Sequence, residues 1–496
     1  MIMLYVRMFF MMLIGLFTSR VVLRTLGVTD FGIYNVVGGV VAMMGLLNGA
    51  MSVSTTRYLT FELGKNDKAR LKQVFSVCMT IYLLLSLIFL VAAETIGLWF
   101  MNTQLVIPPE RITAANWVYQ FSILTVINSL LMNPYNAVLI AHERMNIYAY
   151  ISVLEALLKL GIVYLLLVIP FDRLIVYGFL FMMMTLFTTM IYRIYCIRHY
   201  AESRYSFYWD KPLFLELTSY SGWNLFGSAS SMVKGQGLNI LLNMFFSPAV
   251  NASRGIAYQI NTQITNFFTN FYTAVRPQIT KYYAQNDLDD MFKLVLRSSK
   301  FSFFLILFIS LPVIVEAPFI IRLWLGQLPE YVVPFTRLVI IISAVDAMAS
   351  PTMTAAHATG HIKLYQSVVG TLIMLNVPIS YINLKFFSAS PVSVFVVSLI
   401  LSLIALFTRL WIVKRLIPTF PVTKYIKEIF IKCVILAAFA AIIPICIHEL
   451  VPSSFLVSCI NIFVAFATSA VVIYFLGLTK NERTVLVSTI KKKLHL

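Results

Sequence analysis

Charged residues are scarce in this chain of 496 residues, and acidic residues are the scarcer kind. Only 12% of the residues are Asp, Glu, Lys or Arg, whereas a soluble domain carries about 25%. Polar side chains are therefore too few to cover a water-soluble globule. The chain has 38 basic and 20 acidic residues, a net charge of +18. In so apolar a chain we expect this excess to set membrane topology, and we expect no nucleic-acid partner.

Several motifs that catalytic and metal sites require are also missing. The five cysteines are widely spaced and form no Cys-x-x-Cys pair, which argues against a disulfide framework and against a metal site. The sequence holds no phosphate-cradling P-loop and no Ser-His-Asp constellation, so nucleotide hydrolysis within this chain is not expected. We therefore expect no enzyme activity, no catalytic residue, no metal and no resident cofactor.

Long apolar runs dominate what remains, because 60% of the residues are hydrophobic. A helix needs roughly 20 apolar residues to cross the bilayer, and continuous runs favour helices over the alternating strands of a barrel. The sequence predicts an all-α integral membrane protein with about fourteen spanning helices. The expected spans are 4–24, 31–56, 74–100, 113–141, 147–169, 174–197, 215–246, 250–275, 301–321, 331–356, 364–385, 391–413, 429–449 and 455–477.

The distribution of Lys and Arg supports this number of helices. With the N-terminus inside, most basic residues fall in the inside segments, and the outside turns are short and hold few. The outside turns contain Arg111, Arg173, Arg322 and Lys385. We therefore expect a multi-pass protein of the bacterial inner membrane with both termini in the cytoplasm.

The chain repeats itself at a nearly constant offset. Residues 58–75 match residues 278–295, with Asn-Asp at the same place, and residues 134–148 match residues 351–365. The unit of repetition is six helices, so the two copies have the same orientation in the membrane. Parallel repeats of this kind commonly place a substrate path between the halves and work by alternating access.

This repeat defines the expected domain organisation. An N-terminal six-helix lobe spans 1–211, and a C-terminal six-helix lobe spans 212–417. Two extra helices and a basic cytoplasmic tail occupy 418–496.

Four of the basic residues within or close to the predicted spans are singled out, because charges there are costly and usually face a cavity or a partner. Arg20 and Arg24 are one turn apart near the outer end of the first helix, and either snorkel to the interface or line a cavity. Lys234 lies deep in the seventh helix, and Arg254 lies early in the eighth. These four are the candidates for binding an anionic group.

Amide side chains form a second group of candidates. Several of them share one face of the eighth helix, where they either bond between helices or line a polar path. The candidate lining residues are Asn35, Asn48, Gln236, Gln259, Gln263, Asn266 and Asn270.

Acidic residues within the spans are the candidates for ion coupling. Glu155 and Lys159 are four residues apart, which favours a mutually neutralising pair and leaves open a coupling role. Asp346 in the tenth helix is the other main candidate. Glu94 and Glu316, near outer helix ends, are weaker ones.

Three features resemble a known family. They are the two six-helix halves, the LGVTDFGIYNVV turn (26–37) and the segment GLNILLNMFFSPAVNASRGIAYQI (237–260). Together they look like the multidrug/oligosaccharidyl-lipid/polysaccharide (MOP) exporter superfamily, and most of all like its polysaccharide-biosynthesis, O-antigen-type flippases. The resemblance implies a cationic cavity that engages a lipid-linked diphosphate, which Arg20, Arg24, Lys234 and Arg254 match by position.

The leading hypothesis is a flippase that moves undecaprenyl-diphosphate-linked oligosaccharide by alternating access. Its drive is open between a H⁺ or Na⁺ gradient and the membrane potential, and its expected partners are membrane lipids and other glycan-assembly proteins. The alternative is a cation-coupled multidrug antiporter similar to the MATE family, although the first helix lacks an acid. A polysaccharide polymerase or ligase would need a large outside loop, and a scaffold without a transport role would not need deep polar residues.

Overall fold

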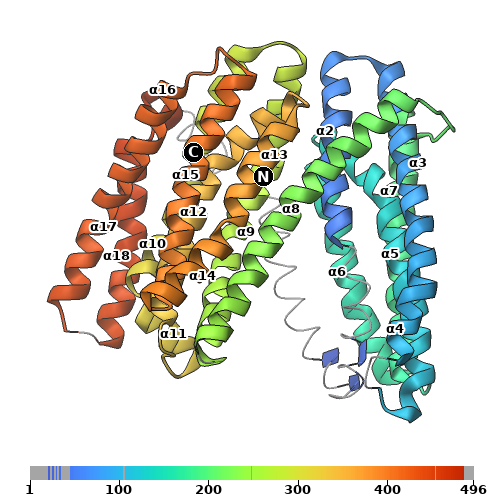
Figure 1. The fold of residues 1–496 in the computed structure, drawn as a ribbon, viewed down its shortest axis with the longest axis horizontal. Coiled ribbons are helices and arrows are strands. Elements are labelled where there is room, and N and C mark those ends of the chain that lie inside the picture. The colour runs from blue at the N-terminus through green and yellow to red at the C-terminus, as the bar shows by residue number, and fades with distance from the viewer. Residues whose placement is uncertain are drawn as a thin grey trace, which may run out of the picture. The chain divides into compact units, whose positions relative to one another are not determined.

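The computed structural model describes residues 21–22, 25–26, 30, 33–34, 45–103, 107–246, 248–452 and 454–484. The chain divides into two compact units. Unit 1 comprises Met1–Ser228 together with Thr280–Asn286, and unit 2 comprises Ala229–Ile279 together with Asp287–Leu496. Each unit is a bundle of helices that run roughly alongside one another (Figure 1).

Unit 1 is built on the helices of the first part of the chain. They are α2 (Gly45–Lys65), α3 (Lys68–Ala92), the π-helical η1 (Ala93–Gly97), α4 (Leu98–Thr103), the short η2 (Pro109–Arg111), α5 (Ile112–Ala141), α6 (Met145–Val168), α7 (Arg173–His199) and the short η3 (Ala201–Ser203). The next helix, α8 (Lys211–Phe245), begins in unit 1 and ends in unit 2.

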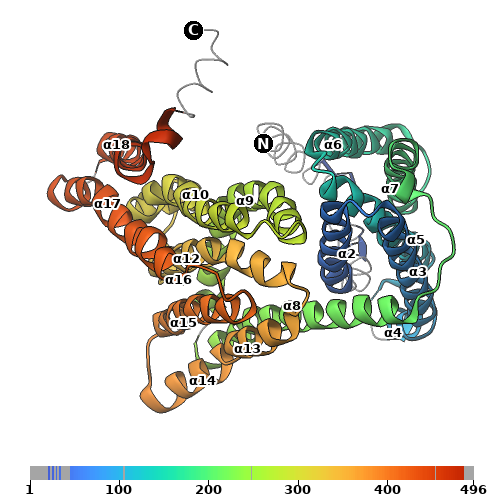
Figure 2. The ribbon, with the colours of Figure 1, turned by 90° about the horizontal axis from the view of Figure 1, so that it is seen from above.

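Unit 2 holds the remaining helices. They are α9 (Pro248–Ala284), α10 (Leu288–Val315), α11 (Ala317–Leu325), α12 (Val332–Ala358), α13 (Ile362–Met374), α14 (Asn376–Phe387), α15 (Val392–Leu416), α16 (Val422–Tyr425), the π-helical η4 (Ile426–Ile431), α17 (Lys432–Leu450), α18 (Phe455–Val472) and the π-helical η5 (Ile473–Gly477). The last turn of α9 belongs to unit 1. Viewed from above, α10, α12 and α15 form a row (Figure 2).

The predicted all-α membrane fold is confirmed. Within the described residues, ten helices are long and apolar enough to cross a membrane. Three further long helices, α2, α8 and α9, match the predicted second, seventh and eighth spans but carry more polar residues. The predicted first span, 4–24, lies almost entirely outside the described residues, as do Arg20, Arg24 and Asn35.

Four helices extend past one end of their predicted spans, in each case an end predicted to be cytoplasmic. α2 continues to Lys65 and α3 already begins at Lys68, although the predicted spans stop at 56 and start at 74. α9 and α10 likewise extend to Ala284 and from Leu288. The extensions carry charged side chains, so an apolar pattern does not reveal them, but helix propensity continues until an Asn-Asp turn.

The repeated Asn-Asp pair forms the same turn in both places. Asn66 and Asn286 adopt φ angles of 59° and 58°, a left-handed conformation that Asn tolerates better than most residues. Asp67 then accepts a hydrogen bond from the backbone N–H of Arg70, and Asp287 caps α10 in the same way. The repeat therefore encodes a tight connection between two helices, with one residue to reverse the chain and one to cap the next helix.

The second repeated segment also shows matching backbone features. Pro134 lies inside α5 and Pro351 inside α12. Nine residues later in each copy, the chain turns at Glu143 and Gly360, with φ angles of 60° and 82°. Glycine adopts this conformation readily, whereas a non-glycine residue there is uncommon.

Apolar side chains fill the interior of each unit. In unit 1, Tyr119 and Val118 of α5 pack with Leu174 of α7. In unit 2, Phe335 of α12 packs with Phe395 of α15 at a ring separation of 4.4 Å.

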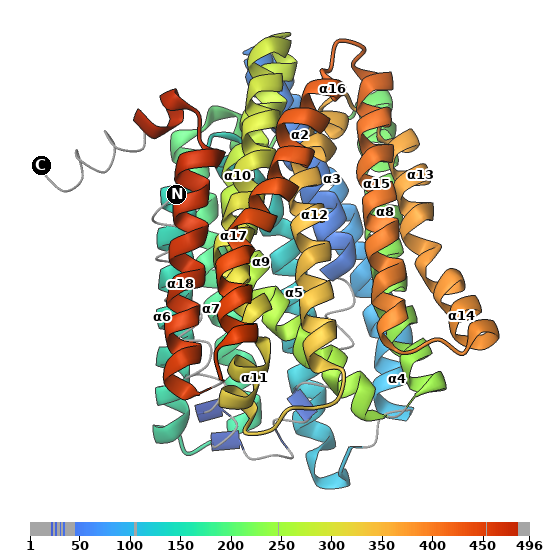
Figure 3. The same ribbon diagram turned by 90° about the vertical axis from the view of Figure 1, so that its left-hand side faces the viewer.

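The last two long helices pack on each other and on α10, as Figures 1 and 3 show. Their outer faces expose large apolar side chains such as Phe439 and Phe463, which suits contact with lipid tails.

Candidate functional site

A polar cavity of about 320 Å³ opens inside unit 2, and we call it the unit 2 cavity. Its walls come from α8, α9, α12, α13, α14 and α15. The lining residues are Ser231, Lys234, Gly235, Tyr258, Asp346, Ile373, Asn376, Leu401, Ser402, Ala405 and Arg409. Three of these carry charge, and they come from three different helices.

The acidic group of the cavity is held by its neighbours. Asp346 of α12 pairs with Arg409 of α15, at 3.3 Å between Oδ1 and Nη1, and accepts a hydrogen bond of 2.9 Å from the Ser402 hydroxyl. Arg409 also donates to the Tyr365 hydroxyl through Nε, at 3.0 Å. The Arg409 side chain is 11% exposed and that of Asp346 is 45% exposed. The arginine thus sits deep in the wall, and the carboxylate it neutralises faces the open space.

The second cation of the cavity is Lys234. It lies on α8 within electrostatic reach of both Asp346 and Arg409, yet it makes no ion pair with any described residue. Since Asp346 is paired with Arg409, the positive charge of Lys234 is left uncompensated in the cavity. A concave site with an uncompensated cation focuses a positive potential and favours an anionic ligand.

Arg254, the other predicted anion-binding residue of this region, lies beside the cavity and not among its lining residues. Its guanidinium donates to the Gly235 carbonyl at 2.6 Å and to Asn239 at 3.2 Å. It also stacks on Tyr258, 4.6 Å from the ring centroid. Gly235 and Tyr258 both line the cavity. Arg254 therefore links α9 to α8 next to residues that form the cavity wall.

The predicted amide residues have mixed environments. Gln236, Gln259 and Gln263 are exposed, and none of them is among the residues that line the unit 2 cavity. Asn266 and Asn270 are half-buried, and the Asn270 side chain donates to the Asn266 carbonyl at 3.0 Å.

In unit 1, two of the predicted polar groups are engaged by their own bundle. Asn48 of α2 bonds across to Ser129 at 3.4 Å and to Asn133, both on α5. Glu155 and Lys159 of α6 form the neutralising pair, 2.8 Å apart, with each side chain about one third exposed. The contacts of Asn48 agree with bonding between helices, and the contact of Glu155 with Lys159 agrees with a mutually neutralising pair.

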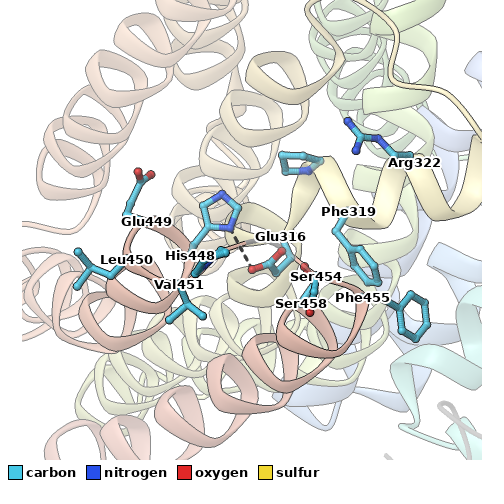
Figure 4. A pocket seen from close by; sticks show the side chains of 12 residues that line it. Glu316, Phe319, Arg322, His448, Glu449, Leu450, Val451, Ser454, Phe455 and Ser458 are labelled. Atoms are coloured by element: carbon cyan, nitrogen blue, oxygen red, sulfur yellow. Dashed lines mark hydrogen bonds and ion pairs between the residues drawn. The ribbon is translucent and has the colours of Figure 1, made fainter.

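A second cavity, of about 660 Å³, surrounds Glu316, one of the weaker predicted acids. Glu316 is 3% exposed and accepts hydrogen bonds from Asn461 at 2.6 Å and from His448, whose ring nitrogen is 3.1 Å away. Figure 4 shows the His448 ring facing the Glu316 carboxyl. The acid therefore links the junction of α10 and α11 to α17 and α18.

Sequence reasoning missed Arg409 and its partner Tyr365. Arg409 lies in the apolar run of the predicted twelfth helix. A charge within an apolar run was the available signal, since such residues usually face a partner or a cavity.

The described residues contain no group of three or more His, Cys, Asp or Glu side chains that could hold a metal ion.

Comparison with known proteins identifies the fold. No protein-family model matches the chain, and no curated protein sequence matches it significantly. Among solved structures, it is similar to an outward-facing multidrug resistance MATE family transporter of the MOP superfamily, with a TM-score of 0.70 and 14% identity over 84% of this chain and 95% of that one.

Two further structures are similar. One is a MOP superfamily transporter from Pyrococcus furiosus, for which reversed polarity of the binding pocket is reported to suggest a different function; its TM-score is 0.66, with 15% identity over 84% of this chain and 95% of that one. The other is a MATE protein in its bent conformation, with a TM-score of 0.64 and 15% identity over 80% and 95% of the two chains. The chain thus has the fold of MOP superfamily transporters, as the resemblance implies.

Proposed function

We propose that this protein is a transporter that moves a lipid-linked oligosaccharide, carried on a polyprenyl diphosphate of the undecaprenyl class, across the bacterial inner membrane. The observation that carries the proposal is the charge balance of the unit 2 cavity. Lys234 and Arg409 face one acid, Asp346, and that acid is already paired. The cavity is therefore suited to an anion.

A diphosphate and its sugars cannot cross hydrocarbon unaided, because each desolvated charge carries a large cost. Lys234 provides a point charge for a phosphate oxygen, and charge-assisted bonds of this type are stronger than neutral ones. The exposed amides Gln236, Gln259 and Gln263 provide donors and acceptors suited to sugar hydroxyls. The polyprenyl tail would stay in lipid.

The fold supports transport by alternating access, because the similar structures include outward-facing and bent conformations of MATE transporters. The Pyrococcus furiosus relative of the fold is described by a pocket of reversed polarity with a suggested change of function. That description supports the inference that the charge of the binding pocket indicates the class of cargo.

The membrane potential offers a drive that needs no coupled ion. An inside-negative potential favours outward movement of negative charge by about 2.3 kcal/mol per charge per 100 mV. We further propose that both termini lie in the cytoplasm and that membrane lipids and other glycan-assembly proteins are the partners of this protein.

The test uses a strain that lacks this protein and has lost its surface glycan. Lys234→Gln is expected to leave the glycan absent although the protein inserts at normal levels, because the uncompensated cation is gone. Lys234→Arg is expected to restore glycan, since it keeps the charge. Lys385→Gln, a matched change at an exposed cation of α14, is the control and should behave as wild type. Full glycan display with Lys234→Gln would contradict the assignment of the cavity.

A cation-coupled multidrug antiporter is the second candidate, favoured by the 45% exposed carboxylate of Asp346 and by the likeness to a multidrug MATE transporter. Drug susceptibility of the deletion strain separates the two functions. Hypersensitivity to cationic drugs that Asp346→Asn fails to rescue, with surface glycan unchanged, would favour the antiporter.

A further inference from the structure

A separate basic pocket of about 490 Å³ lies in unit 2, at helix ends predicted to be cytoplasmic. We call it the basic pocket. It is formed by the start of α10, by α16, η4 and the start of α17, and by the segment after η5. Its lining residues are Lys293, Leu296, Arg297, Lys300, Lys424, Glu428, Ile429, Lys432, Thr479 and Glu482. Five of them are basic and two are acidic.

One of the two acids is fixed and neutralised at the base of the pocket. Glu482 and Thr479 exchange backbone and side-chain hydrogen bonds, at 2.8 and 3.4 Å, which is the reciprocal arrangement of a capping box. Glu482 also accepts two hydrogen bonds from Lys300, at 2.8 and 2.6 Å. Lys300 is only 7% exposed. These two charges therefore compensate each other and hold the wall in place.

The charges nearer the opening are not balanced. Lys293 is paired with Asp290 at 2.7 Å, and Arg297 reaches Glu482 only at 3.7 Å, with its side chain 52% exposed. Lys424 and Lys432 form no ion pair with any described residue. Arg297 of α10 and the two lysines of the continuous helix Val422–Leu450 therefore outnumber Glu428, the other acid of the pocket, and leave a net positive site.

Large apolar side chains lie exposed beside these cations. Ile431 at the end of η4 and Val434 and Ile435 of α17 flank Lys432 in the chain, and Phe475 and Leu476 come just before Thr479. A soluble phosphate would use only the cations. A membrane lipid would use both, with its headgroup in the pocket and its acyl chains on the adjoining apolar surface.

We propose that the basic pocket binds the phosphate headgroup of an anionic phospholipid of the cytoplasmic leaflet. Basic pockets between spanning helices on that side are suited to such headgroups. The site lies apart from the unit 2 cavity and shares no lining residue with it, so the inference does not depend on the proposed cargo. A bound lipid would bridge α10 to α16 and α17, and so would add a link between α10 and the last two long helices, which already pack on it.

The test measures lipid binding to the delipidated full-length protein by native mass spectrometry. The probes are cardiolipin, phosphatidylglycerol and phosphatidylethanolamine, with glycerol phosphate as a headgroup without chains. We expect the anionic lipids to bind, phosphatidylethanolamine to bind weakly and glycerol phosphate not to compete. The double variant Lys424→Gln/Lys432→Gln should bind anionic lipid about 25-fold more weakly, at about five-fold per lysine.

The matched control is Lys72→Gln/Lys211→Gln, which removes two exposed cations of unit 1. It should leave lipid binding unchanged. All substituted lysines except Lys432, which is half-buried, are exposed, and thermal unfolding of each variant without lipid checks that the fold is kept. Equal losses in both double variants would mean nonspecific attraction and would overturn the proposal. Full competition by glycerol phosphate would assign the pocket to a free phosphate and overturn its lipid identity.

Discussion

Asp346 and Arg409 are expected to depend on each other for stability, because each neutralises the other inside the bundle. Arg409→Gln should lower the stability of the detergent-purified protein by about 1.5–3 kcal/mol, the scale of a hydrogen bond to a charged group. Asp346→Asn should be similarly damaging, since it leaves Arg409 unpaired. The double variant should recover part of the loss, as thermal unfolding would show.

Ser402→Ala, which removes only the hydroxyl bond to Asp346, is the comparison variant and should cost less. A double variant whose loss equals the sum of the two single losses would show that the two residues are not coupled. The ion pair would then contribute nothing to the free energy of unfolding.

For single residues, the sequence indicates which charged side chains lie within the predicted spans, but not which groups surround them. Lys234, which the sequence places deep in the seventh span, and Asp346, a candidate for ion coupling, both line the unit 2 cavity. Arg254, early in the eighth span, instead bonds to α8, and Arg409 is not among the residues that the sequence indicates. A uniformly apolar helix lacks the polar stripe that reveals which of its faces points into the bundle. The depth of a residue within its span can therefore be predicted from the sequence, whereas the direction of its side chain cannot.

The hydrogen bonds that attach the helices α17 and α18 to the rest of unit 2 are expected to stabilise the protein. Glu316 is buried and receives hydrogen bonds from both helices, through His448 and Asn461. Asn461→Leu should destabilise the protein by about 1–3 kcal/mol, because it leaves a buried carboxylate short of a donor. Thermal unfolding in detergent measures the loss.

Glu449→Gln is the control for this junction, since Glu449 lines the same cavity but is exposed and pairs with no described residue. It should unfold like wild type. If Asn461→Leu also unfolds like wild type, the Glu316 cluster does not hold the two helices.

The start of α8 gives a prediction with a pH signature. Asp210 caps this helix, accepting from the Leu213 N–H at 3.0 Å, and pairs with Arg70 of α3 at 3.0 Å. The backbone N–H and the guanidinium hold the pKa of Asp210 below its usual range. A carboxyl whose folded pKa is depressed adds stability above its unfolded value, near 3.9, and loses it as the pH falls through the folded value.

Asp210→Asn should therefore lower the unfolding temperature at about pH 7 and at about pH 5, and the difference from wild type should shrink below about pH 4. Asp289→Asn, at an exposed acid of α10 that pairs with no described residue, serves as the control. A difference that stays constant down to about pH 3 would show that the charge of Asp210 is not the cause.

At the scale of elements, the predicted spans agree closely with the helices wherever an apolar run has clear ends. α6, for example, covers Met145–Val168 against a predicted 147–169. The prediction fell short where helices continue past the apolar run, as in α9 and α10, because charged residues favour helix as readily as loop. The Asn-Asp repeat marked the true turn at Asn286.

For the whole molecule, the all-α membrane architecture followed from the shortage of charge, and comparison with solved structures confirms the MOP-type fold. The three-part division at residues 211 and 417 stays a prediction. The cargo could not be derived from the fold, since MOP-type folds occur with pockets of differing polarity. Charge in a single cavity is what distinguishes the candidate functions.

Transport in proteoliposomes that hold only this protein tests whether the unit 2 cavity selects an anionic lipid-linked cargo, as we propose. The assay follows fluorescent polyprenyl-diphosphate sugar and, separately, a fluorescent cationic drug. We expect wild type to move the diphosphate lipid and not the drug, and we expect Lys234→Gln to lose at least ten-fold in rate, on the scale of one charge-assisted bond. Transport of the drug, with Lys234→Gln moving the diphosphate lipid as fast as wild type, would contradict this proposal.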